Sequence, residues 1–351
     1  ALSKSLTVSS NLENADVHII CVPTPFLNDK TPDLSFVFDA VEKITSILKK
    51  GDLVILESTV PIGTTEKIRD IVKKRRGDLH FSEHYESSDS DIHIAYCPER
   101  VLPGNIFEEL YKNSRVIGGL TKKCSEKASE IYKLFVSSTI SNTDSKTAEF
   151  IKLAENTYRD INIAIANEFS MMAHREKLDI NEIISITNQH PRVNILKPGC
   201  GVGGHCIAVD PYFIVSDYPL ESKIIGKARE VNNYKTFWCA EKIQNEKLKF
   251  ELKHGRKASV ALMGLAFKPD IDDLRESPAN YIVQKVLQNS NKHEHCIVEP
   301  NIGSHSHYKL TEYNEAVEKS DIIVFLVAHK EFRKLKLKKN KFVIDFCGIV
   351  K

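Results

Sequence analysis

The sequence lacks several features that mark particular classes of protein. No apolar run in its 351 residues approaches the roughly 20 residues that a transmembrane helix needs, and no secretory leader pattern opens it. Its eight cysteines include no Cys-x-x-Cys pair, which argues against a disulfide framework and against a four-ligand zinc site. We therefore expect a cytoplasmic protein with free thiols and no membrane partner.

A strong excess of either charge is also missing. The formal net charge is +2, and the basic runs at 73–76 and 334–341 contain no aromatic residues. Such runs are typical of solvated faces, so we expect no nucleic-acid partner. There is no internal repeat and no low-complexity tract. The length and a hydrophobic content of 42% indicate two or three domains with sizeable cores.

Short apolar runs alternate with helical patterns along the chain. The runs indicate strands in two groups, 17–22, 53–57 and 92–97, then 258–267, 296–300, 321–327 and 342–345. Helical periodicity follows at 33–49, just after Thr65, at 147–177, at 221–253 and from about Ser277. The alternation predicts an α/β fold with two parallel sheets joined by a long central helical region. The two long helices predict a spacer and an interface between copies, hence a homodimer or a higher homo-oligomer.

The segment from Gly199 to Pro211 is the most informative part of the sequence. It places Cys206 at the end of a glycine-dense loop, four residues before Asp210. Glycines allow close approach of a ligand, and such a loop can present a reactive thiolate. Two other interpretations stay open: a buried structural cysteine, and a metal site formed by His205, Cys206 and His190.

Four stretches, in the right order, resemble the nucleotide-sugar 6-dehydrogenase family, which includes UDP-glucose dehydrogenase. They are residues 94–104, 190–196, 202–211 and 265–269. The resemblance implies two Rossmann-like domains around the central helices. It assigns an NAD-binding domain to 1–145, the central region with the cysteine loop to 146–253, and a UDP-sugar-binding domain to 254–351. A literal match to G-x-G-x-x-G, at Gly199, Gly201 and Gly204, is not expected to be the cofactor turn, because Pro198 precedes it where a strand should end.

The resemblance also implies the chemistry. The family oxidises a sugar C6 alcohol to a carboxylate with two NAD⁺, through a thiohemiacetal and then a thioester on the cysteine. His205 stands where UDP-glucose enzymes typically have serine, which points to an N-acetylated sugar. We expect UDP-N-acetyl-D-mannosamine as the substrate, with UDP-N-acetylglucosamine and UDP-glucose as alternatives, and surface polysaccharide synthesis as the destination of the product.

Each implied role falls on a residue of this sequence that matches the family pattern. The catalytic residues implied are Cys206, Lys152, Asn156, Asp210 and Glu99. The cofactor-binding residues implied are Pro23, Thr24, Ser58, Thr59, Glu99 and Arg275. The substrate-binding residues implied are Arg100, Val101, Lys152, Asn156, Arg192, Lys197, Gly203 and Lys268. No metal is expected.

The sequence departs from the family pattern at its start. The first strand, the glycine turn and the acidic residue of the NAD domain have no counterpart, so we expect the first domain to be incomplete at its N-terminal side. An alternative is therefore a truncated homologue that binds a UDP-sugar without turning it over. Two smaller departures are Cys200, where relatives usually have proline, and Cys347, where a basic residue is common.

Overall fold

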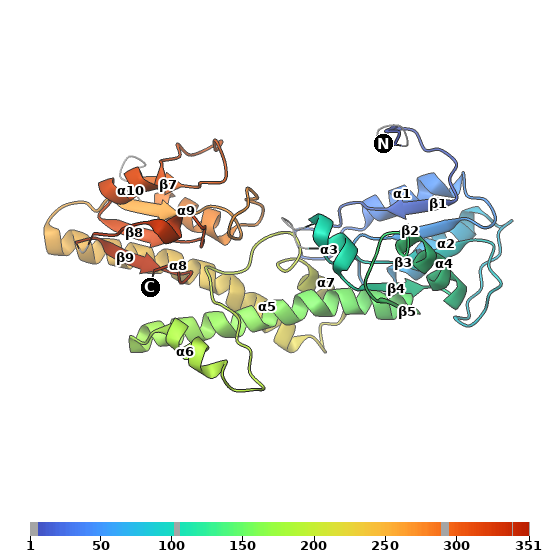
Figure 1. Cartoon of the computed structure of the whole chain (residues 1–351), viewed down its shortest axis with the longest axis horizontal. Coiled ribbons are helices and arrows are strands. Elements are labelled where there is room, and N and C mark those ends of the chain that lie inside the picture. The colour runs from blue at the N-terminus through green and yellow to red at the C-terminus, as the bar shows by residue number, and fades with distance from the viewer. Residues whose placement is uncertain (1–5, 102–105, 289–294, 339, 351) are drawn as a thin grey trace. The chain divides into compact units, whose positions relative to one another are not determined.

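The computed structural model describes residues 6–101, 106–288, 295–338 and 340–350. Residues 102–104 of the predicted family motif lie outside this part of the chain. The chain divides into two compact units, one formed by residues 1–155 and 212–218, the other by 156–211 and 219–351. Each unit contains one sheet (Figure 1).

The sheet of the first unit has five strands in the order β1-β2-β3-β4-β5. Their bounds are β1 Val17–Ile20, β2 Leu53–Leu56, β3 His93–Tyr96, β4 Arg115–Gly119 and β5 Ile140–Asp144. β1, β2 and β3 are parallel, with Val17 opposite Leu53 and Leu53 opposite His93. β4 pairs antiparallel with β3 and parallel with β5. The expected parallel arrangement is thus present in β1–β3, and the antiparallel pair was not predicted.

Alternating side chains of these strands face two apolar layers. On one face, Val54 and Leu56 of β2 pack with apolar residues of α1 (Ser35–Thr45) and α2 (Thr64–Arg75). On the other face, Leu53 and Ile55 pack with α4 (Lys122–Tyr132). A strand buried on both faces reads as a continuous apolar run, which is why β2 was visible in the sequence. The short helix α3 (Ile106–Lys112) precedes β4.

Four helices lie between the two sheets in the sequence. They are α5 (Ser145–Glu176), α6 (Ile180–Thr187), α7 (Asp210–Asp217) and α8 (Lys223–His254). The predicted long helices at 147–177 and 221–253 correspond to α5 and α8, within two residues at every end. Both α5 and α7 contribute residues to each unit.

The sheet of the second unit is parallel throughout, in the order β7-β6-β8-β9. Its strands are β6 (Val260–Met263), β7 (His295–Val298), β8 (Ile322–Phe325) and β9 (Phe342–Asp345). Apolar residues of α8 and α9 (Pro278–Gln288) cover one face. The short helix α10 (Tyr313–Lys319) and Phe332 in the 3₁₀ turn η3 (Phe332–Lys334) cover the other. The connection after β6 runs over one face of the sheet, and the connection after β8 runs over the other. The carboxyl ends of these two neighbouring strands therefore form the topological switch point of the sheet, where its connections change faces.

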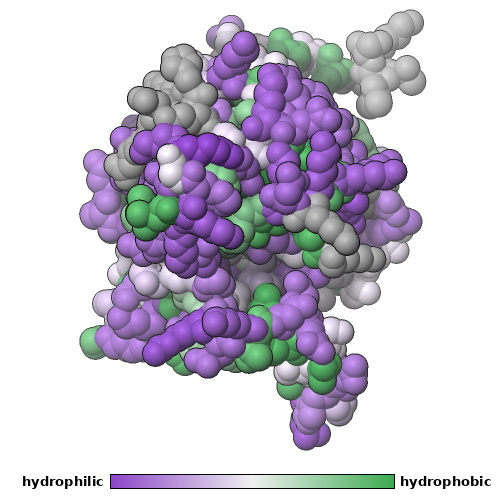
Figure 2. All heavy atoms as spheres, turned by 90° about the vertical axis from the view of Figure 1, so that its left-hand side faces the viewer, coloured by the Kyte–Doolittle hydropathy of each residue, from purple (hydrophilic) through white to green (hydrophobic). Residues whose placement is uncertain are grey.

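The surface is that expected for a chain with 27% charged residues. On the face shown in Figure 2, hydrophilic side chains dominate, with hydrophobic ones in small groups among them. None of the helices in the described ranges is both long and apolar enough to cross a membrane.

Candidate active site

The loops that follow β1 and β2 lie at the same edge of the first sheet, because the strands are parallel. Pro23 and Thr24 belong to the first of these loops, and Ser58 and Thr59 to the second. The Ser58 hydroxyl donates to the Val22 carbonyl oxygen at 2.7 Å and accepts from the Val22 N–H at 2.8 Å. This reciprocal pair fixes the two loops against each other.

Glu99, in the loop after β3, has a carboxylate that is held from two sides. Its Oε1 accepts from the backbone N–H of Arg100 at 2.6 Å and of Val101 at 2.9 Å. Its Oε2 lies 3.2 Å from Nη1 of Arg115. The Arg115 side chain is 1% exposed, and the Glu99 side chain is 37% exposed. The buried guanidinium needs this partner, so Arg115 both orients Glu99 and depends on it.

The same loop is tied to α5. Lys152 is buried on α5, and its Nζ donates to the Glu99 carbonyl oxygen at 2.7 Å. Arg100 binds Glu155 through two N–H groups, at 3.1 Å and 2.5 Å. Bidentate pairs of this kind fix direction as well as distance. Within the first unit, the structure therefore brings together Glu99, Arg100 and Lys152.

The cysteine loop of the second unit runs from α6 to α7, and it is anchored at its start. The Gly199 N–H donates to Oδ1 of Asn167 on α5 at 2.9 Å. The Cys200 carbonyl oxygen accepts from the Thr236 hydroxyl of α8 at 2.9 Å, and its thiol donates to the Leu326 carbonyl oxygen at 3.4 Å. These anchors leave the rest of the loop to be placed by its glycines.

The glycines pack closely against the second sheet's connections. A Cβ on Gly203 would lie 2.5 Å from the Glu276 carbonyl oxygen and 3.0 Å from Cβ of Phe267. Gly204, at φ +84°, would bring a Cβ within 2.8 Å of the Phe267 ring. The element directly before this stretch is the helix α6 and not a strand, so the G-x-G-x-x-G match lacks the strand that a cofactor turn follows, as predicted. The glycines serve close packing around the loop that carries the cysteine.

Cys206 is exposed, and it opens the turn that leads into α7. Its carbonyl oxygen accepts from the N–H groups of Val209 and Asp210, each at 2.9 Å. Asp210 is 3% exposed, and its carboxylate accepts from Nδ2 of Asn156 at 2.5 Å. The interpretation of Cys206 as a buried structural thiol is wrong. One turn instead connects an exposed thiol to a buried Asp210–Asn156 pair.

Charged groups surround this turn. Arg275 forms an exposed ion pair with Asp273 at 2.6 Å, which raises the pKa of Arg275, and the negative form of Cys206 adds to that rise. Nδ1 of His205 lies 4.0 Å from the same Asp273 carboxylate. Burial, followed by the charge of Arg275, lowers the pKa of His205. Arg275 is thus a cation within electrostatic reach of Cys206.

Arg192 lies exposed in the loop between α6 and the cysteine segment. The amide of Asn188 closes this loop by accepting from the Ile195 N–H at 2.7 Å and donating to the Ile195 carbonyl oxygen at 3.0 Å.

In the same unit, Lys268 follows β6, and its Nζ lies 5.9 Å from the centroid of the Phe267 ring.

Lys197 lies at a pocket of about 470 Å³ within the second unit. Lys235, Trp238 and Cys347 also line it. Lys235 is buried, its Nζ lies 4.1 Å from the Trp238 ring centroid, and burial lowers its pKa. Asp179 and Asp345 line the pocket too, so it combines an aromatic face with groups of both charges.

Sequence reasoning missed the partners that orient the site residues. They are Arg115 beside Glu99, Glu155 beside Arg100 and Asp273 beside Arg275. Only the last could have been found from a local pattern, Asp-x-Arg, because the others come from distant elements. Among the described residues, the metal-ligating atoms of Asp270, His329 and Glu331 lie within 4.8 Å of one another, and His205 and Cys206 belong to no such group of three.

Three family models match the chain. They are the NAD binding domain of the UDP-glucose/GDP-mannose dehydrogenase family over residues 1–136, its central domain over 146–234 and its UDP binding domain over 261–351.

Curated and solved relatives match over nearly the whole chain. A UDP-N-acetyl-D-mannosamine dehydrogenase of Campylobacter jejuni is 49% identical over 95% of this chain and 82% of its own length. An NDP-N-acetyl-D-galactosaminuronic acid dehydrogenase of Ralstonia nicotianae is 46% identical over 98% and 81%. The solved UDP-D-ManNAc dehydrogenase of Pyrococcus horikoshii is 36% identical, covers 96% of this chain and 78% of its own, and has a TM-score of 0.84.

Proposed function

Because this chain belongs to the UDP-glucose/GDP-mannose dehydrogenase family, we propose that it oxidises UDP-N-acetyl-D-mannosamine at C6 to the carboxylate. The family resemblance, the fold class and the NAD-dependent dehydrogenase activity expected from the sequence are confirmed. NAD is the cofactor and a UDP-sugar the substrate. We assign the uronate product to surface polysaccharide synthesis.

The observation that carries the proposal is the exposed Cys206 thiol on the turn that ends at the buried Asp210–Asn156 pair. In the proposed reaction, C6 loses a hydride and its hydroxyl proton to give an aldehyde. The Cys206 thiolate adds to this carbonyl and forms a thiohemiacetal. Loss of the second hydride gives a thioester, and water cleaves its C–S bond to release the carboxylate and the thiol.

Bound NAD⁺ supplies the acceptor for each of the two hydrides. The residues at the carboxyl ends of β1 and β2 fit a dinucleotide, because they offer backbone groups and the hydroxyls of Thr24 and Thr59 in part-exposed loops. We propose that Pro23, Thr24, Ser58 and Thr59 bind this cofactor. We propose the same role for Glu99 and Arg275.

The remaining residues of the chain hold protons and charge in this scheme. We propose that Lys152 and Asn156 stabilise the oxyanion that develops on the sugar oxygen, since an ammonium and an amide N–H both suit that charge. Asp210 accepts a proton from the attacking water, and its bond to Asn156 fixes its direction. Glu99 is proposed to assist proton transfer near the reacting carbon.

Substrate binding is proposed for the remaining residues of the predicted set. They are Arg100, Val101, Arg192, Lys197, Gly203 and Lys268. Gly203 lets the backbone beside the cysteine loop pack closely and be approached by the sugar, and the cations suit the diphosphate. The 470 Å³ pocket beside Lys197 is a proposed place for part of the nucleotide.

Replacing the sulfur tests the covalent scheme. Cys206→Ala should abolish carboxylate formation, and Cys206→Ser should stall at the ester stage, because a hydroxyl forms a more stable ester. Cys296→Ala is the matched control, since this half-buried thiol lies on β7. Mass spectrometry of the protein and its products distinguishes the stages. Full activity in Cys206→Ala would remove the covalent mechanism.

Competition among sugars tests the substrate. Turnover of UDP-N-acetyl-D-mannosamine should exceed that of UDP-N-acetylglucosamine and UDP-glucose, and the galacto epimer belongs in the same assay because of the Ralstonia relative. A preference for UDP-glucose refutes the proposal. Calorimetry with NAD⁺ and with UDP addresses the alternative of a homologue that binds without turnover, which requires UDP to bind and NAD⁺ not to bind.

We also propose a homodimer or a higher homo-oligomer in the cytoplasm. The supporting feature is a stripe of half-exposed and exposed apolar side chains on α5, at Tyr158, Ile161, Ile165, Phe169 and Met172. Their spacing places them on one face of the helix. The free thiols support a reducing compartment. The domain boundaries at 145 and 253 stay predictions.

A further inference from the structure

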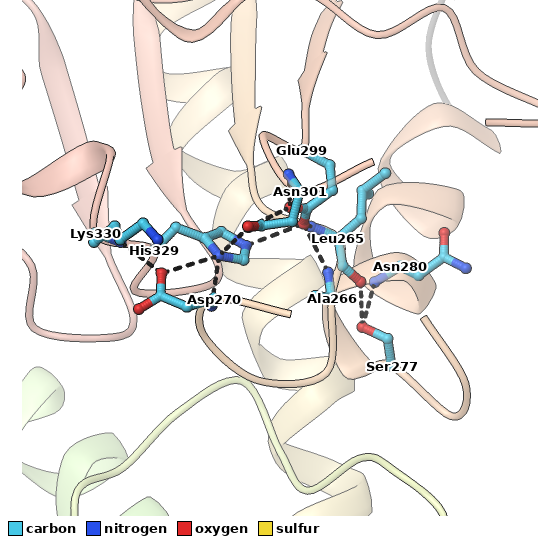
Figure 3. A network of polar contacts seen from close by, with 9 residues as sticks. All are labelled: Leu265, Ala266, Asp270, Ser277, Asn280, Glu299, Asn301, His329 and Lys330. Atoms are coloured by element: carbon cyan, nitrogen blue, oxygen red, sulfur yellow. Dashed lines mark hydrogen bonds and ion pairs between the residues drawn. The ribbon is translucent and has the colours of Figure 1, made fainter. Parts of the chain in front are cut away.

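A buried network holds the three loops at the carboxyl ends of β6, β7 and β8. At its centre is Glu299, which follows β7 and is 3% exposed. Its Oε2 accepts from the N–H groups of Leu265 at 2.7 Å and Ala266 at 2.9 Å, and Nε2 of His329 lies 3.0 Å away (Figure 3). Its Oε1 accepts from the backbone and the amide of Asn301. Every partner of this carboxylate is a donor.

His329 extends the network to the far end of the β6 loop. It is 0% exposed, and its Nδ1 accepts from the Asp270 backbone N–H at 3.0 Å. With Nδ1 accepting, Nε2 carries the proton and donates to Glu299. The Asp270 carboxylate in turn accepts from the Lys330 N–H at 2.9 Å. Since the Nδ1 lone pair is engaged, the cluster of Asp270, His329 and Glu331 is better explained as a brace than as a metal site.

The β6 loop, residues 264–270, is therefore fixed at both ends. Glu299 holds Leu265 and Ala266, and His329 holds Asp270 (Figure 3). On the opposite side, the Ser277 hydroxyl donates to the Leu265 carbonyl oxygen at 2.6 Å. Between these anchors the Phe267 N–H donates to the Asp273 carbonyl oxygen at 3.2 Å, so the network and this bond together hold Phe267 and Lys268.

Those two residues face the proposed active site of the same unit. Gly204 packs against the Phe267 ring and Gly203 against the Phe267 Cβ, and the ring lies edge-on to His205 at 6.5 Å between ring centroids. A displacement of Phe267 must therefore move the glycines that precede Cys206. Lys268 would move with it.

We propose that Glu299 and His329 are positioning residues, which place Lys268 for the substrate diphosphate and, through Phe267, place the loop of Cys206. The proposal rests on the proposed function for the roles of Lys268 and Cys206. The pair touches neither substrate nor cofactor, and it acts only through the backbone of residues 264–270.

Glu299→Gln is the sharpest test, because it keeps the shape of the side chain and replaces one acceptor oxygen with an NH₂ group. That group then faces hydrogen-bond donors only. UDP affinity should fall by roughly 10-fold, and kcat/KM for the UDP-sugar by roughly 10–100-fold, as expected for a displacement near 1 Å. The KM for NAD⁺ should change less than about twofold. By contrast, the rate at which iodoacetamide alkylates Cys206, measured by peptide mapping, should change.

A graded series at the histidine tests the same idea if Glu299→Gln folds poorly. His329→Gln keeps a donor toward Glu299 and loses the acceptor for Asp270, whereas His329→Ala loses both. UDP affinity should therefore fall in the order wild type, His329→Gln, His329→Ala. Asp321→Asn is the matched control. It alters a carboxylate that accepts from Ser259 and Arg256 just before β8, at the amino end of the same sheet.

The outcomes separate this proposal from the proposed function. Folded Glu299→Gln protein with wild-type UDP affinity and wild-type alkylation of Cys206 overturns the positioning role, whatever the activity. A uniform loss of activity that Asp321→Asn shares also overturns it, because that result reports stability alone. Full activity in Cys206→Ala overturns the covalent function and leaves the measured UDP affinities to decide the positioning role.

Discussion

Adding one methyl group at Gly203 should displace the cysteine loop. The new Cβ would lie 2.5 Å from the Glu276 carbonyl oxygen and 2.5 Å from Cδ of Pro278, both rigid neighbours. Restoring ordinary contact at 3.4 Å requires a shift of about 1 Å. Overpacking of this size costs about 1–3 kcal/mol of stability. Because Cys206 is three residues away, we expect kcat to fall by about 100-fold in Gly203→Ala.

Gly199→Ala is the control within the same loop. The nearest atom to its added Cβ would be the Gly201 carbonyl oxygen at 3.9 Å, so neither stability nor rate should change much. Urea unfolding and steady-state rates on both variants make the comparison. Wild-type kcat in a folded Gly203→Ala protein would refute the idea that this packing sets the position of the nucleophile.

Two further predictions concern stability. Asp160→Ala removes the partner of the buried Arg229, whose Nη1 lies 2.6 Å from Oδ1, and should lower the free energy of unfolding by about 3–5 kcal/mol in a urea titration. A loss below about 1 kcal/mol contradicts this account. For Glu299, burial alone would raise the pKa, but the bond from His329 and the backbone N–H groups lower it from 4.5 to about 2. The contribution of ionised Glu299 to the free energy of unfolding is therefore complete above about pH 4.5 and is lost as the pH falls toward 2. The stability difference between wild type and Glu299→Gln should shrink by about 2 kcal/mol from about pH 6 to about pH 3, and a constant difference argues against it.

The elements that could be predicted are those whose own residues determine them. The buried strands β2 and β8 read as apolar runs, and α5 and α8 as long helices. β4 and β5 could not be found, because β4 ends in two glycines and β5 contains one apolar residue, Ile140. The structure explains the glycines: a Cβ at Gly118 would lie 2.5 Å from the Asp144 carbonyl oxygen, and one at Gly119 2.3 Å from that of Thr121.

A similar limit applies to the site. Motifs pointed to the residues that are proposed to carry chemistry, because Cys206, Asp210 and Lys268 each lie in a matching stretch. Motifs could not identify Arg115 or His329, since each is chosen by what lies beside it in the fold. The role of a buried charged group or imidazole ring depends on its hydrogen-bond partners, and these lie on other elements of the fold.

The first strand of the five-stranded sheet has a neighbour on one side only. Within the described residues β1 pairs with β2 alone, and Ile19 on it is 49% exposed. Unpaired backbone groups beside an exposed β-branched side chain form a template for adding another strand, from a second molecule or from elsewhere.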